Sequence, residues 1–159
     1  AFDEKYWCYF EESDLCWRAW VMGYHVAFEP KSIIYHKMGA TSATMRSAFI
    51  HYHSFKNRIR TIIKNASLTT LFWMFPIHIV ICIGLSVYFF LSGQISGSLA
   101  IPKAIWWNIL NISDTLEKRS IIQKKRKLSD NEIFKLVMKN PPLSFYLHHL
   151  SLVKINLKK

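Results

Sequence analysis

Acidic residues are scarce in this sequence of 159 residues, which has 10 Asp and Glu against 21 Lys and Arg and a formal net charge of +11. Cysteines are scarcer still. Cys8, Cys16 and Cys82 are odd in number and have no zinc-like spacing, which argues against a disulfide framework. Yet 51% of the residues are hydrophobic. A soluble globular domain seldom combines these properties, so the composition favours a membrane-associated protein with basic flanks.

The sequence has no charged residue at all between positions 68 and 91. As a helix, this run would extend about 36 Å, enough to cross a hydrocarbon core of about 30 Å. Pro76 could kink such a helix, and His78 would need a polar partner. A buried helix of a soluble protein seldom runs this long without a charge. We therefore expect a transmembrane helix over residues 68–92, and no role in binding nucleic acid, the competing explanation of the positive charge.

Basic residues lie on both sides of this hydrophobic block. Residues 46–67 predict a basic juxtamembrane helix, and residues 118–159 predict a basic cytoplasmic tail. Residues 95–117 are apolar but interrupted by Lys103, which is typical of an amphipathic helix that lies in the interface or returns across the membrane. The positive-inside rule prefers both flanks in the cytoplasm, and hence a hairpin or re-entrant pair over a single crossing.

Local signals predict several boundaries. The apolar spacing of residues 13–22 predicts a helix that ends at Gly23, while residues 25–29 and 32–36 read as two short strands. Near the other end, Ser129 and Glu132 form a capping-box signature that opens a short helix over residues 130–139.

Three carboxylates, Glu11, Glu12 and Asp14, lie within four positions, and His36 ends the second predicted strand. Like charges this close repel each other and raise a pKa, so a fold usually keeps them for proton transfer or metal binding. The plainer explanation is that all three are ordinary first-turn acids, which helix N-termini favour. A lone histidine such as His36 is likewise more often a polar cap or a core residue than a metal ligand. Spacing alone leaves both alternatives open.

A resemblance bears on this choice. The segments Phe2-Asp3-Glu4, Tyr9-Phe10-Glu11-Glu12-Ser13-Asp14-Leu15-Cys16-Trp17-Arg18 and Ile34-Tyr35-His36-Lys37-Met38-Gly39 closely resemble the C-terminal part of family 2 glycosyltransferases. The likeness is to the rhamnosyltransferase-like, polysaccharide-building branch. It continues through Lys56-Asn57-Arg58, the hydrophobic block and the basic run from Lys118 to Lys127, and so covers most of the chain.

The resemblance implies a fold and an activity. It implies that residues 1–45 are an α/β fragment, the C-terminal part of a GT-A domain, followed by a mainly α-helical membrane-associated region. The activity would be inverting transfer of a hexosyl or rhamnosyl group from a nucleotide-sugar donor to a lipid-linked or cell-surface polysaccharide acceptor.

The resemblance also implies roles for the candidate residues. Glu12 maps onto the general base that deprotonates the acceptor, at a position where the family usually has aspartate. Glu11 and Asp14 would be supporting acids. His36 maps onto a histidine that in some members binds the divalent metal, Mn or Mg, that holds the donor diphosphate.

The N-terminal nucleotide-binding half of that family has no counterpart in the sequence. We therefore expect a fragment or one half of a split enzyme, inactive in isolation, at the cytoplasmic membrane with its catalytic part facing the cytoplasm. The alternative is a non-catalytic membrane protein whose basic faces bind anionic lipid or a partner protein.

Overall fold

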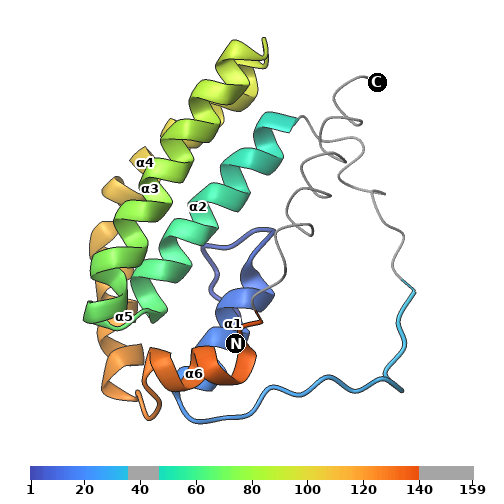
Figure 1. Cartoon of the computed structure of the whole chain (residues 1–159), viewed down its shortest axis with the longest axis vertical. Helices are drawn as coiled ribbons and strands as arrows, with labels where there is room; N and C mark the ends of the chain where they lie inside the picture. The colour runs from blue at the N-terminus through green and yellow to red at the C-terminus, as the bar shows by residue number, and fades with distance from the viewer. Residues whose placement is uncertain (36–46, 140–159) are drawn as a thin grey trace.

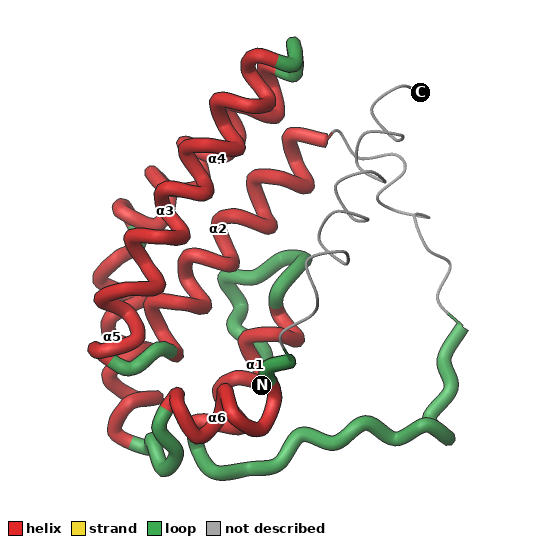
Figure 2. Tube along the Cα trace, in the orientation of Figure 1, coloured by secondary structure: helices red, strands yellow, loops and turns green. Residues whose placement is uncertain are grey.

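The structure, a computed structural model, describes residues 1–35 and 47–139 (Figure 1). Within these residues the chain forms six helices and no strand (Figure 2). The helices are α1 (Glu11–Val21), α2 (Ser47–Asn65), α3 (Leu68–Leu91), α4 (Ile95–Leu110), α5 (Ile112–Lys124) and α6 (Asp130–Val137).

The predicted α/β character of residues 1–45 is therefore wrong for the described part of that segment. Residues 25–29 and 32–35, read as strands from their sequence, are irregular and exposed. Ile34 and Tyr35 are 81% and 99% exposed. Because β-propensity measures how well a side chain fits a paired, half-buried surface, β-forming residues with no partner strand remain a loop.

Helices α2, α3 and α4 form one packed group. Helix α2 lies against both α3 and α4, and the turn between α3 and α4 lies at the end of the molecule opposite α6 (Figure 1). Phe55, Cys82, Ile101 and Ala104 form the core of this group. Ser86 and Ser98 lie at the α3–α4 contact, where small residues allow the two helices to approach closely.

Helices α1 and α6 pack at the other end of the molecule. Val21, Ile122 and Ile133 from α1, α5 and α6 form a second core. Helix α1 ends as predicted: Gly23 follows it with a φ of 81°, a left-handed conformation that glycine adopts without steric cost. The predicted capping box at Ser129 is also confirmed, with both of its reciprocal hydrogen bonds present.

Residues 95–117 do not form one helix. The chain breaks at Asn111, between α4 and α5, where the Asn111 side chain donates a hydrogen bond of 2.9 Å to the carbonyl of Trp107. An asparagine that binds a neighbouring backbone carbonyl competes with helix continuation.

Helix α3 is long and apolar enough to cross a membrane. Its 24 residues contain a window with a mean hydropathy of 2.2, and only 11% of that window is buried within the protein. Among the described residues, it is the one helix with these properties.

Candidate functional site

The three clustered acids lie in the first turn of α1, which begins at Glu11, earlier than the sequence predicted. Asp14 is fully buried. Arg18 donates a hydrogen bond of 2.9 Å to Oδ2 of Asp14, and Asn65 donates one of 2.9 Å to Oδ1. Lys64 Nζ lies 3.0 Å from the same Oδ1. Asp14 therefore anchors α1 to the C-terminal end of α2 and is not available to an external molecule.

The other two acids lie in different environments. The Glu11 side chain is half-buried, and its Oε2 has no hydrogen-bond partner among the described residues. Glu12 is exposed to solvent and makes no ion pair with any residue in the described ranges. Of the three carboxylates, Glu12 is the one that an external molecule can reach freely.

The backbone directly before α1 is strained. Tyr9 and Phe10 have φ angles of 65° and 67°, in the left-handed region that costs a non-glycine residue on the order of 1–3 kcal/mol. Asn57 in α2 holds this turn, because its Nδ2 donates hydrogen bonds of 2.7 Å to the carbonyls of Cys8 and Tyr9. The guanidinium of Arg58 lies 4.7 Å from the centre of the Phe10 ring. The first turn of α1 is thus positioned by α2.

A buried ion cluster surrounds Asp3. Oxygens of Asp3 accept hydrogen bonds from Arg60 Nε at 3.0 Å, Lys64 Nζ at 2.5 Å and Lys118 Nζ at 2.7 Å. Arg60 also pairs with Asp114 and donates to Thr115. Burial raises the pKa of Asp3, but hydrogen bonds from Arg60, Lys118 and Lys64 outweigh it and hold that pKa far below its ordinary value.

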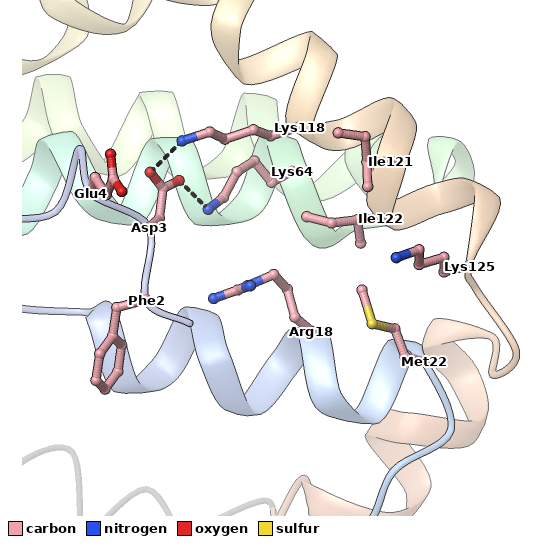
Figure 3. Close-up of a pocket in the computed structure, with 10 residues that line it drawn as sticks. All are labelled: Phe2, Asp3, Glu4, Arg18, Met22, Lys64, Lys118, Ile121, Ile122 and Lys125. Atoms are coloured by element: carbon pink, nitrogen blue, oxygen red, sulfur yellow. Dashed lines mark hydrogen bonds and ion pairs between the residues drawn. The ribbon is translucent and has the colours of Figure 1, made fainter.

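A basic pocket adjoins this cluster (Figure 3). It has a volume of about 470 Å³ and lies between the segment before α1 and helices α1, α2 and α5. Its four basic side chains are Arg18, Lys64, Lys118 and Lys125. Lys118 and Lys64 reach Asp3, whereas Lys125 faces Met22 at the other end of the pocket (Figure 3). Arg18, Lys64 and Lys118 already pair with Asp14 or Asp3, and Glu4 also lines the pocket. Lys125 is the basic lining residue that forms no ion pair with any described residue.

The metal site predicted at His36 is not tested by the described residues. His36 lies outside them. Within residues 1–35 and 47–139, no group of three or more His, Cys, Asp or Glu side chains could hold a metal ion.

Sequence reasoning missed the residues that hold the site together. Asp3 and Asn57 lie in segments that resemble the glycosyltransferase family, and Lys64 lies in the basic stretch over residues 46–67, but the sequence predicted no function for any of them. The signal was available: Lys56, Arg60 and Lys64 recur every four residues, as do Asn57, Thr61 and Asn65. Two adjacent polar stripes on a helix indicate a polar partner for that face.

No protein-family model, no curated protein and no solved structure matches this chain.

Proposed function

We propose that this chain supplies the acceptor-activating carboxylate and the membrane attachment of an inverting glycosyltransferase. In this proposal Glu12 is the general base, and the acceptor is a lipid-linked or cell-surface polysaccharide. The donor is a nucleotide sugar held by a nucleotide-binding part outside this chain. The observation that carries the proposal is the position of Glu12, exposed on the first turn of α1 and free of ion pairs with described residues.

A second observation supports it. Two segments that resemble the family, residues 9–18 and 56–58, are far apart in the sequence but lie in contact. The amide of Asn57 binds the turn at Tyr9, directly before the acidic residues. A base must be held within hydrogen-bond reach of the proton it takes, so a fixed turn before Glu12 suits this role.

The proposed step is a single displacement. Glu12 takes the proton of an acceptor hydroxyl while the hydroxyl oxygen forms a bond to the anomeric carbon of the donor sugar. The bond from that carbon to the diphosphate oxygen breaks, and the nucleoside diphosphate leaves with the electron pair. Attack opposite the leaving group inverts the anomeric configuration. Glu12 then returns its proton to water.

The test is a comparison of Glu12→Gln, Glu12→Asp and Glu117→Gln in the intact protein. Glu117 is exposed on α5 and serves as the matched control. We expect Glu12→Gln to lower transfer of labelled sugar from a panel of nucleotide sugars to the membrane fraction by at least about 100-fold, the usual contribution of a general base. Glu12→Asp should retain part of the activity, and Glu117→Gln all of it. Near-wild-type turnover by Glu12→Gln would remove Glu12 from the mechanism.

The basic pocket favours a second candidate function, in which the protein binds anionic lipid without catalysis. That function needs Lys125 but not Glu12. It predicts that K125Q weakens binding to anionic vesicles, that binding falls steeply with salt, and that no nucleotide sugar is consumed.

A further inference from the structure

Helix α3 is apolar around its whole circumference, so that both its packed face and its exposed face are apolar. One face packs against α2 and α4 through His78, Cys82 and Phe89. The other face is exposed along the full length of the helix: Leu68, Phe72, Trp73, Ile77, Val80, Ile81, Ile83, Val87, Tyr88, Phe90 and Leu91. An exposed apolar surface of this extent marks an interaction site.

The exposed face of α4 continues this surface. It presents Ile95, Leu99, Trp106, Ile109 and Leu110. The two helices are joined side by side by reciprocal hydrogen bonds, in which Ser86 Oγ donates to the carbonyl of Ser98 at 2.9 Å and Ser98 Oγ donates to the carbonyl of Ser86 at 2.8 Å. The exposed apolar side chains of α3 and α4 therefore form one surface, which we call the α3–α4 face.

The elements packed beside α3 argue against a crossing of the membrane by this helix. Helix α2 runs alongside α3, and its buried Arg60 and Lys64 are bound to Asp3 in the non-helical segment before α1. Arg60 and Lys64 lie in the last two turns of α2, directly before α3. If α3 stood across a bilayer, the segment that binds them would therefore lie beside the first turns of α3, in or next to the hydrocarbon. Non-helical backbone exposed to lipid costs several kcal/mol for each unsatisfied polar group.

Lys103 leads to the same conclusion. Ile101 packs with Cys82, and Ile105 lines an apolar cavity with Ile79, so Lys103 lies beside the middle of α3. It is exposed and forms no ion pair within the described ranges. In a crossing hairpin this ammonium group would lie near the bilayer centre, which is strongly unfavourable.

The layers of the molecule suit a different orientation. Helices α3 and α4 lie on one side, α2 lies in the middle, and α1 with the segment before it lies on the other side (Figure 1). We propose that the α3–α4 face lies in the plane of one membrane leaflet, with α3 parallel to the surface and both of its ends on the same side of the bilayer.

The edge of this face supports a lipid occupant. Lys103, Trp106, Trp107 and Tyr52 gather around one shallow pocket there, which Leu99 and Leu110 of the α3–α4 face also line. Tryptophan and tyrosine favour the headgroup level, and a lysine there can extend its ammonium group to anionic headgroups. This inference rests on the shape and polarity of the helices and not on the proposed transferase activity.

The experiment measures depth at three positions along α3. Thr69→Cys, Val80→Cys and Ser92→Cys are introduced singly into the full chain with Cys8, Cys16 and Cys82 changed to alanine, and each carries a fluorophore. Quenching by lipids with a nitroxide on the fifth or the twelfth acyl carbon then reports depth, in vesicles of phosphatidylcholine and phosphatidylglycerol. Ser13→Cys, exposed on α1, is the water-side control.

We expect one shallow depth for all three positions, with stronger quenching by the fifth-carbon nitroxide and none at Ser13→Cys. A crossing helix would instead place Val80→Cys deepest and make Ser92→Cys reactive only from the opposite side of the vesicle, and this result would overturn the proposal. Association of copies with no vesicle binding would overturn it as well.

A second pair of variants needs no cysteine replacement. Val80→Lys should weaken binding of the otherwise unchanged chain to the same vesicles at least tenfold, and Ser13→Lys should change it less than twofold. Equal effects of the two variants would contradict a lipid-facing α3, whatever the cysteine variants show.

Discussion

Helices α2 and α3 are neighbours with opposite arrangements of polarity. Helix α2 buries charged side chains, among them Lys56, Arg60 and Lys64, whereas α3 leaves large apolar side chains exposed along its length. Each arrangement is costly unless a partner compensates it. For α2 the partners are internal: Arg60 and Lys64 pair with the carboxylates of Asp3, Asp14 and Asp114. Lys56 donates a hydrogen bond to the backbone carbonyl of Lys5. For α3 we propose that the partner is lipid.

Removal of one charge from the ion cluster around Asp3 should have the largest effect on stability. Arg60→Met removes the buried arginine that pairs with the buried Asp3 and with the partly exposed Asp114. Loss of one partner of a buried ion pair costs about 3–5 kcal/mol. We expect a loss of this order in chemical denaturation followed by circular dichroism. Lys124→Met, at an exposed position on α5, is the control and should change stability little. Equal stability of Arg60→Met and the parent would contradict the role of the cluster.

The second-largest effect on stability should come from acidification, which acts on Asp3 in the same ion cluster. The pKa of Asp3 is lowered from 3.8, chiefly because hydrogen bonds from Arg60, Lys118 and Lys64 outweigh the effect of burial. Its stabilising contribution is therefore full above about pH 4 and is lost as the pH falls toward the folded-state pKa, on the order of 3 kcal/mol for one such carboxylate. Melting curves between neutral and acidic pH should show this loss. Asp3→Asn should start less stable and lose less on acidification; a parallel decline would exclude Asp3 as the group responsible.

Loss of the hydrogen bonds that join α2 to the turn before α1 should reduce stability less than loss of a charge from the ion cluster. Asn57→Ala removes two hydrogen bonds, each contributing about 1 kcal/mol, and releases the strained turn at Tyr9 and Phe10. We expect a loss of about 2 kcal/mol in stability, together with lower transferase activity through displacement of Glu12. Activity that falls without any loss of stability would indicate a more direct role for Asn57.

The smallest effect on stability should come from a substitution at the contact between α3 and α4. Ser98→Ala removes hydrogen bonds between α3 and α4. Because polar contacts between helices in apolar surroundings average about 0.6 kcal/mol, this variant should be barely less stable than the parent. A loss of stability as large as that of Arg60→Met would mean that the contact between α3 and α4 stabilises the protein as much as the ion cluster around Asp3 does, and would contradict the comparison of the two helices.

The sequence predicted those parts of the fold that depend on local signals. The capping box at Ser129 and the stop at Gly23 act within a few residues, and the apolar run over α3 is one continuous segment. None of them depends on a distant partner, so the pattern was sufficient. The prediction of strands over residues 25–29 and 32–36 was wrong for the described residues 25–29 and 32–35, because a strand depends on a distant partner, which local propensity does not reveal.

The candidate site was predictable only in outline. The cluster of Glu11, Glu12 and Asp14 was visible, but the spacing could not separate a structural acid from a free one. Asp14 is structural because Lys64 and Asn65, some fifty positions away, contact it. Such long-range pairs follow from the packing of α1 on α2; the polar stripes of α2 indicate a polar partner for that face but not which residue it is.

Hydrogen–deuterium exchange with and without vesicles tests the difference between the two helices most directly. Our account predicts that added vesicles slow exchange along the whole of α3 and α4, including the turn at Ser92, and leave α1 and the segment around Asp3 unchanged. Protection that covers α1 as strongly as α3, or no protection of α3 at all, would contradict it.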